Sequence, residues 1–256
     1  MTAQPAEASD MPDTSAYAEE RERHWAEFAA STAPLRDYWA EWERRSHGWR
    51  VPIEFLQPVG LDSPQFAEPL APLLRALEAL DDVVVVPVEW MHITSIHVGF
   101  LMSTDIMWSQ VESFYVNASP RLHRIAPFSL QLGGISMTED AVYLGVDDGL
   151  VFREVRRQVG LGVPKVHQVL REDPLVTPEG DHFVPRIEIA HFTGKGERSR
   201  VVETLAPYRE LDAGRLPITH VKMARVPIQP HDHYHPIDVI AEIGLLGEQY
   251  RQGYHN

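Results

Sequence analysis

The spacing of apolar residues changes several times along the chain, and each change marks a predicted element. Six stretches have helical spacing, and Pro34 starts the second of them. Ser103 precedes the fourth as a suitable N-cap. The predicted helices cover residues 15–33, 34–47, 69–80, 103–115, 150–159 and 198–208.

Extended stretches rich in β-branched and aromatic residues lie between these helices. The first is flanked by prolines, which predicts an edge strand. The polar residues 138–140 predict a turn that joins two strands into an antiparallel hairpin. Helices that punctuate such strands predict an α+β fold. The strands are expected within residues 51–59, 83–100, 128–137, 141–146, 183–193, 217–228 and 237–245.

Composition narrows the functions open to the chain. Its 256 residues contain no Cys, which excludes disulfides, thiolate metal sites, iron–sulfur clusters and cysteine nucleophiles. The formal net charge of −14 disfavours binding to long nucleic acids or anionic membranes, although a local basic pocket could still hold a small anion. No apolar run approaches the roughly 20 residues of a membrane span. The acidic first residues do not resemble a secretory signal, so we expect a cytoplasmic protein. The oligomeric state is left open.

Two His-x-Thr tripeptides lie on predicted strands. They are His92-Ile93-Thr94 and His191-Phe192-Thr193, separated by 99 residues, a distance that suits two halves of a pseudo-symmetric fold. Residues i and i+2 of a strand face the same way, so each tripeptide presents an imidazole and a hydroxyl together. Across a cleft, the hydroxyls could bind phosphoryl oxygens while the imidazoles act as general base and general acid. This set could hydrolyse a phosphodiester without a metal or cofactor.

The stretch around the first tripeptide resembles a known family. Residues 88–100, VEWMHITSIHVGF, look like the first motif strand of the 2H phosphoesterases, a family that includes 2'-5' RNA ligase and cyclic phosphodiesterase-like proteins. The similarity extends from Leu35 to the end of the chain, with Phe-x-Pro at 183–185 and a late Tyr234.

The resemblance implies a bilobal fold over residues 51–256, with two pseudo-symmetric antiparallel sheets, flanking helices and a central cleft. A disordered tail at 1–14 and a helical extension at 15–50 would precede this domain. The family acts on 2',3'-cyclic phosphates or 2'-5' linkages, so the implied substrate is a small nucleotide or an RNA end.

The second motif departs from the family pattern. In relatives His-x-Thr or His-x-Ser directly follows Phe-x-Pro, whereas here Arg186-Ile187-Glu188 follows it and His191 comes five residues after Arg186. In a regular strand His191 would therefore face away from Arg186. Either a bulge brings His191 and Thr193 into the cleft, or Arg186 and Glu188 occupy the motif positions. The apolar Ile187 favours the second alternative, and the literal tripeptide followed by glycine favours the first.

Two functions follow from these alternatives. The first is a metal-independent phosphodiesterase in which His92 and His191 transfer protons and Thr94 and Thr193 bind phosphate. The second is a repurposed scaffold that binds or transforms another ligand, phosphorylated or from specialised metabolism, with His92, Arg186 and Glu188. Arg186 could bind phosphate but could not act as a base, because arginine stays protonated.

Other histidines and the tryptophans carry weaker predictions. The run His231–His235 could present imidazoles to a metal, but Pro230 and Pro236 bracket it and favour a turn. His97 lies five residues after His92 and is expected to face away from the site as a structural residue. Helix packing is the expected role of Trp25, Trp39, Trp42 and Trp49.

Overall fold

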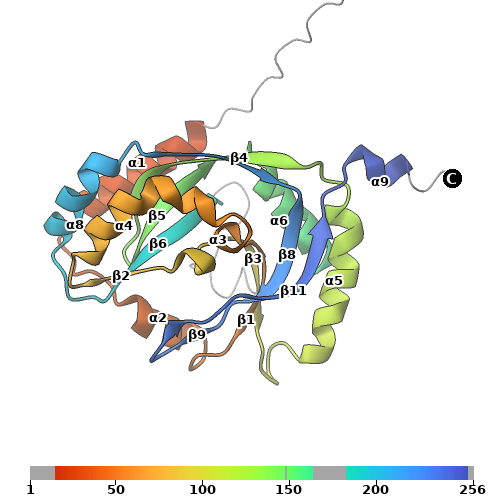
Figure 1. Ribbon diagram of the computed structural model, residues 1–256. Helices are drawn as coiled ribbons and strands as arrows, with labels where there is room; N and C mark the ends of the chain where they lie inside the picture. The colour runs from red at the N-terminus through yellow and green to blue at the C-terminus, as the bar shows by residue number, and fades with distance from the viewer. Residues whose placement is uncertain (1–14, 148, 164–182, 253–256) are drawn as a thin grey trace, which may run out of the picture.

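The computed structural model describes residues 15–147, 149–163 and 183–252 (Figure 1). Among them, antiparallel strands form a four-stranded sheet in the order β11-β8-β1-β3 and a five-stranded sheet in the order β2-β6-β5-β4-β7. A two-stranded ribbon, β9-β10, is separate. The strands are β1 Pro52–Gln57, β2 Val83–Val85, β3 Ile93–Phe100, β4 Phe128–Met137, β5 Ala141–Asp147, β6 Arg186–Phe192, β7 Asp212–Ile218, β8 His220–Arg225, β9 Ile228–Gln229, β10 His233–Tyr234 and β11 Asp238–Gly244.

Helices flank both sheets, which confirms the predicted α+β class with two sheet-based lobes. Helix α1 packs on β4 and β5, α4 packs on β2, and α5 and α6 pack together beside β11 and β3 (Figure 1). The α-helices are α1 Ser15–Ala30, α2 Tyr38–Arg45, α3 Val59–Asp62, α4 Ala71–Glu78, α5 Trp108–Leu122, α6 Val151–Gly162, α8 Arg198–Leu205 and α9 Glu248–Gln252. Short 3₁₀ helices are η1 Pro64–Leu70, η2 Val88–Trp90 and η4 Ala206–Tyr208.

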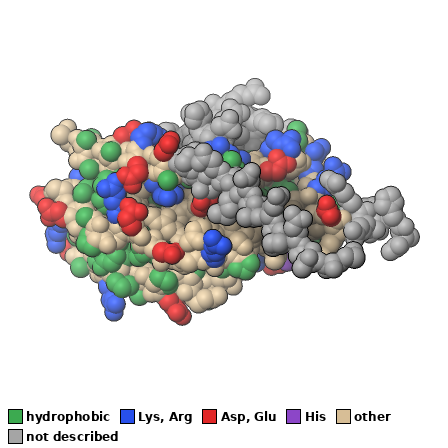
Figure 2. Space-filling model, turned by 90° about the horizontal axis from the view of Figure 1, so that it is seen from above, with side chains coloured by type: hydrophobic (Ala, Val, Ile, Leu, Met, Phe, Trp, Pro, Cys, Tyr) green, Lys and Arg blue, Asp and Glu red, His purple; other side chains and the backbone are tan. Residues whose placement is uncertain are grey.

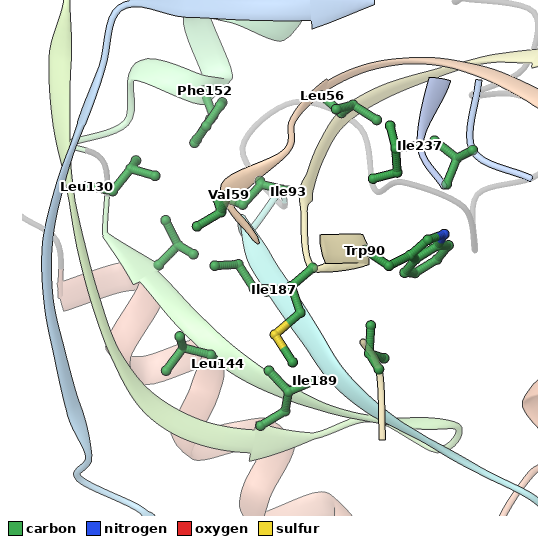
Figure 3. Packing of buried hydrophobic residues seen from close by; sticks show 14 of the residues in the cluster. Leu56, Val59, Trp90, Ile93, Leu130, Leu144, Phe152, Ile187, Ile189 and Ile237 are labelled. Carbon is green, nitrogen blue, oxygen red and sulfur yellow. The ribbon is translucent and has the colours of Figure 1, made fainter. Parts of the chain in front are cut away.

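The N-terminal helices belong to the core of the molecule. Trp25, Phe28, Leu35 and Tyr38 are buried in one hydrophobic cluster with residues of both sheets. Figure 3 shows the part of this cluster where Ile187 and Ile189 of β6 pack near Leu144 of β5. The extension at residues 15–50 is therefore packed against the rest of the chain.

Strand β1 lies inside its sheet, so the prediction of an edge strand is wrong. It pairs with β3 on one side and with β8 on the other. Pro52 is tolerated because it is the first residue of the strand, and Pro58 comes only after the strand ends.

Two helices begin at least four residues later than predicted. Helix α2 begins at Tyr38 rather than at Pro34, because the Asp37 carboxylate accepts hydrogen bonds from the backbone N–H groups of Trp39 and Ala40 at 2.9 and 3.2 Å. Helix α5 begins at Trp108 rather than after Ser103.

Both strands that carry the site contain β-bulges. Ser95 and Val98 of β3 have no partner in β1, and Ile189 of β6 has no partner in β5. An unpaired residue shifts the alternation of the strand, so side chains beyond it change face. The two histidines that follow Ser95 and Ile189 are affected in this way.

On the face drawn in Figure 2, outside the grey region, Lys and Arg side chains are interspersed with Asp and Glu. In the described part of the chain, no helix has the length and apolarity needed to cross a membrane.

Candidate active site

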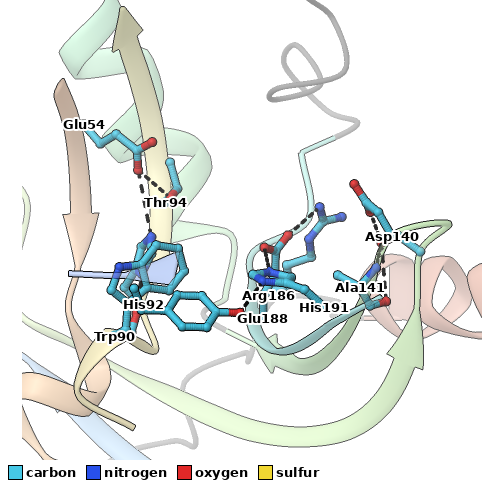
Figure 4. A network of polar contacts seen from close by, with 11 residues as sticks. Glu54, Trp90, His92, Thr94, Asp140, Ala141, Arg186, Glu188 and His191 are labelled. Carbon is cyan, nitrogen blue, oxygen red and sulfur yellow. Dashed lines mark hydrogen bonds and ion pairs between the residues drawn. The ribbon is translucent and has the colours of Figure 1, made fainter. Parts of the chain in front are cut away.

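A pocket of about 350 Å³ lies where β3 of one sheet meets β6 of the other. Side chains from β1, β3 and β6 line it, and helices α1 and α2 contribute further residues. The polar side chains that line it include six from β1, β3, β6 and the residue before β3, namely Glu54, His92, Thr94, His97, Arg186 and Glu188. Figure 4 shows five of them in two neighbouring networks, one with Glu54, His92 and Thr94 and one with Arg186 and Glu188.

His92 is held with one ring nitrogen available to the pocket. Its Nδ1 lies 2.6 Å from the carbonyl oxygen of Trp90, and the two rings meet edge to face. A carbonyl can only accept, so the hydrogen bond assigns the proton to Nδ1 of the neutral ring. Nε2 then carries a lone pair and lies 4.0 Å from Oε2 of Glu54. This arrangement suits proton transfer at Nε2.

Glu54 organises the first half of the pocket. Its Oε2 accepts a hydrogen bond from the Thr94 hydroxyl at 2.7 Å, and its Oε1 lies 3.3 Å from Nδ1 of His97. Burial opposes ionisation of Glu54, but the hydrogen bonds from His97 and Thr94 and the charges of His97 and His92 outweigh it and lower the pKa of the carboxyl. The pocket therefore contains a buried carboxylate that accepts the hydrogen bond of the Thr94 hydroxyl.

His97 faces the pocket, which corrects the expectation that it faces away. The bulge at Ser95 places it on the side of Thr94, where both contact Glu54. The sequence gives no spacing signal for Glu54, because it lies on a different strand from His92.

Arg186 and Glu188 line the second half of the pocket. Nη2 of Arg186 lies 3.1 Å from Oε1 of Glu188, and the guanidinium lies 5.5 Å from the ring centre of Tyr143. Burial opposes ionisation of Glu188, but His191 and Arg186 outweigh it and hold the pKa of the carboxyl far below its usual value. This half therefore offers a permanent cation beside an ionised carboxylate.

His191 and Thr193 lie outside the lining of this pocket. The bulge at Ile189 turns His191 to the side of Glu188, where Nε2 lies 2.9 Å from Oε2 of the carboxylate. His191 is nevertheless 0% exposed, because the ring of Tyr38 from α2 stacks on it at 3.5 Å. Thr193 donates its hydroxyl proton to the carbonyl oxygen of Asp82 at 3.3 Å. A catalytic role for either residue stays a prediction.

Residues in corresponding positions of the two halves of the pocket are 94 residues apart in the sequence, whereas the two His-x-Thr tripeptides are 99 residues apart. In β3 the bulge at Ser95 directly follows Thr94, and two residues later His97 contacts the Glu54 carboxylate. In β6 the bulge at Ile189 directly follows Glu188, and two residues later His191 contacts the Glu188 carboxylate. The corresponding pairs are His92 with Arg186, Thr94 with Glu188, and His97 with His191. Strand β6 therefore contains a bulge, but Arg186 and Glu188 line the pocket and His191 and Thr193 do not.

The N-terminal extension supplies a wall of the pocket that sequence patterns did not assign to the site. Nδ1 of His24 in α1 lies 2.7 Å from the hydroxyl of Tyr143, and His24 lines the pocket beside Arg186. From α2 come Tyr38 and Trp42. In the sequence, the only pattern in this region was the helical spacing of its aromatic residues. For Trp42 that spacing predicted helix packing rather than a place in the pocket.

The histidine run near the C-terminus covers the turn and the second strand of the ribbon β9-β10. His231 is exposed, and His233 stacks on Trp39 with ring centres 3.8 Å apart. Within residues 15–147, 149–163 and 183–252, no three His, Asp or Glu side chains are grouped so that they could hold a metal ion.

Comparisons with solved structures identify the fold. The crystal structure of TT0787 of Thermus thermophilus matches with a TM-score of 0.56 and 18% identity, over 77% of this chain and 99% of that chain. Crystal structures of Escherichia coli LigT in complex with NADP+ and with ATP match with TM-scores of 0.52 and 11% identity, over 77% of this chain and 98% of theirs. No protein-family model and no curated protein sequence matches the chain.

Proposed function

We propose, from the premise that the chain has the 2H phosphoesterase fold, that it is a metal-independent phosphodiesterase acting on a small nucleotide. The substrate would carry a 2',3'-cyclic phosphate or a 2'-5' linkage. The observation that carries the proposal is Nε2 of His92, held ready for proton transfer in the same pocket as Arg186. The crystallisation of E. coli LigT with NADP+, ATP and 3'-AMP supports a nucleotide ligand.

His92 and Arg186 take different roles in this proposal. Arg186 donates hydrogen bonds to the non-bridging phosphoryl oxygens, and Glu188 holds the guanidinium in place. His92 transfers the proton at Nε2. His191 supports Glu188 from behind rather than touching the phosphoryl group, because Tyr38 covers its ring. This assignment replaces the pair of imidazoles with one imidazole and one guanidinium.

The pocket favours a small ligand. Its volume of about 350 Å³ is at the lower end of the usual range for small-molecule sites. The aromatic rings of Tyr38, Trp42 and Trp90 line it and could stack on a nucleobase. We therefore expect a mononucleotide or dinucleotide, or the terminal residues of an RNA, to be the substrate.

A panel of 2',3'-cyclic mononucleotides and 2'-5' dinucleotides, incubated with and without EDTA, tests the proposal. We expect the wild type to open or cleave at least one of them in EDTA. His92→Ala should lower kcat by about 10²- to 10⁴-fold. His220→Ala is the matched control, because His220 is exposed and lies outside the lining of the pocket. Activity that disappears in EDTA, or equal rates for wild type and His92→Ala, would contradict the proposal.

The second candidate is a phosphoryl-ligand binding protein on the same scaffold. The replacement of an imidazole and a hydroxyl by Arg186 and Glu188 favours it, because a guanidinium binds anions but does not transfer protons. Calorimetry with 3'-AMP separates the two functions. Binding by a wild type that turns over no member of the panel, weakened in Arg186→Lys, would support the binding protein.

A further inference from the structure

We infer that Glu54 is a catalytic residue which, with His92, binds the attacking water in the first half of the pocket, where Thr94 donates its hydroxyl proton to the same carboxylate. The inference rests on the proposed hydrolysis of a phosphodiester. It changes the role predicted for Thr94, because the threonine hydroxyl would donate to Glu54 on the side of the attacking water instead of donating to phosphate.

Two hydrogen-bond acceptors, Nε2 of His92 and the Glu54 carboxylate, face each other at this place. Nε2 of His92 has its lone pair free, because Nδ1 holds the ring proton against Trp90. Glu54 is an ionised carboxylate, and Thr94 has committed its only proton to it. A group with two protons to donate is the complement of such a set, and water is the smallest such group.

The distance between the acceptors also fits a shared water. Oε2 of Glu54 and Nε2 of His92 are 4.0 Å apart, which is too long for a direct hydrogen bond. Two acceptors that bind the two protons of one water are separated by about 4–5 Å. A water at this position would donate one proton to His92 and the other to Glu54.

The charge of Glu54 places the phosphoryl group on the opposite side. A buried carboxylate repels phosphoryl oxygens, and the Thr94 hydroxyl cannot donate to them while it donates to Glu54. Arg186 attracts them on the second half. The pocket would thus have a nucleophile side on β1 and β3 and an anion side on β6.

In the hydrolytic step, the bound water attacks phosphorus and the leaving ribose oxygen departs. The water oxygen bonds to phosphorus as the bond from phosphorus to the leaving ribose oxygen breaks. The water proton passes to Nε2 of His92, and the imidazolium that forms is stabilised by the Glu54 carboxylate. The leaving oxygen takes a proton from solvent, and His92 later returns its proton to solvent.

A merely structural role for Glu54 would not require its charge. Among the residues that the structure describes, Glu54 has the polar partners His92, His97 and Thr94, all on or beside β3, and β8 pairs Ala224 with it. Glutamine could also accept from Thr94, without the cost of burying a carboxylate. The position of this buried carboxylate, 4.0 Å from Nε2 of His92, therefore points to a function in proton transfer.

Glu54→Gln tests the inference, with Glu154→Gln as a matched control on the outer helix α6, where Glu154 pairs with Arg157. We expect Glu54→Gln to lower kcat by about 10²-fold. The rising limb of kcat/KM against pH should move to lower pH, because the imidazolium loses its neighbouring anion. Calorimetry should give 3'-AMP binding that is unchanged or tighter, because a repulsive charge is removed.

Each result decides for or against Glu54. Wild-type kcat and an unmoved pH limb in Glu54→Gln would overturn the inference while leaving the proposed function intact. Weaker 3'-AMP binding together with a lower melting temperature would assign Glu54 a structural role. If Glu54→Gln does not fold, Thr94→Val decides, since unchanged 3'-AMP binding is expected and weaker binding would restore Thr94 as a phosphate donor. A wild type with no turnover on the panel would instead overturn the proposed function, and the inference with it.

Discussion

Each half of the pocket centres on a carboxylate whose partners differ in kind. Glu54 contacts a hydroxyl and two imidazoles, whereas Glu188 contacts a guanidinium and one imidazole. Both carboxyls have a lowered pKa despite burial. A carboxylate held in this way stabilises the fold only while it is ionised.

Glu188 should make the stability of the protein depend on acid pH. Its folded pKa lies below the ordinary value of 4.5, so its contribution is present above that pH and is lost as the pH falls below it. We expect Glu188→Gln to lower the unfolding free energy at neutral pH and to flatten its decline in acid. Urea unfolding at a series of pH values measures this slope. Glu242→Gln, at a carboxylate with a side chain 54% exposed, should leave the slope unchanged, and equal slopes for Glu188→Gln and wild type would contradict the prediction.

Among the individual residues of the site, the sequence could predict those whose role depends on one short segment. The chemistry of His92 followed from its own tripeptide, and the apolar Ile187 and Ile189 correctly indicated that Arg186 and Glu188 point toward the pocket. Glu54 lies 38 positions before His92, and only strand pairing brings the two together. The side of the strand on which a histidine lies after a bulge cannot be read from alternation alone.

Helix α2 is the element that closes the second half of the pocket. It contributes Tyr38 over His191 and Trp42 to the pocket lining. With 8 residues, it is too short to be stable alone, so its position depends on its cap and its packing. The Asp37 side chain provides the cap, and the backbone of Asp37 forms an isolated β-bridge with Thr193.

Removing this cap should loosen the wall of the pocket. We expect Asp37→Ala to lower the unfolding free energy by about 1 kcal/mol. Hydrogen exchange should also become faster at the amides of α2. Asp37→Asn should behave like wild type, since an asparagine oxygen can accept the same two hydrogen bonds. Equal exchange in α2 for all three proteins would show that packing alone holds the helix.

Patterns within short segments of the sequence predicted most helices and strands, but not which strands pair with one another. The turn at residues 138–140 and the two strands around it follow directly from composition, and the structure has them as β4 and β5. The interior position of β1 depends on pairing with β8, which lies far away in the sequence. Prolines beside a strand therefore indicated its ends and not its place in the sheet.

The whole molecule combines a small pocket with a strongly negative charge. The net charge of −14 opposes the approach of a polyanion, while Arg186 offers a local partner to one phosphate group. Binding at such a site depends on fit within the pocket more than on a long-range field. The protein should therefore distinguish ligands by their size and by the number of their charges.

Competition with RNA should reveal this selectivity. We expect an RNA oligonucleotide without a cyclic or 2'-5' end to leave mononucleotide turnover unchanged. The KM for the mononucleotide should vary little with salt, because few counterions are released at a single phosphate. Turnover measured across a salt series, with and without the oligonucleotide, gives both quantities. Strong inhibition by the oligonucleotide, relieved by salt, would contradict the prediction.

The bulge at Ile189 has a consequence for how distant homologues are recognised. An alignment that superimposes the two His-x-Thr tripeptides places His191 against His92 and moves the second half out of correspondence by five positions. Aligning the bulges instead pairs His92 with Arg186 and His97 with His191. A search for proteins that share this chemistry would then use the paired patterns His-x-Thr-x-x-His and Arg-x-Glu-x-x-His, and it would pass over proteins that merely repeat the tripeptide.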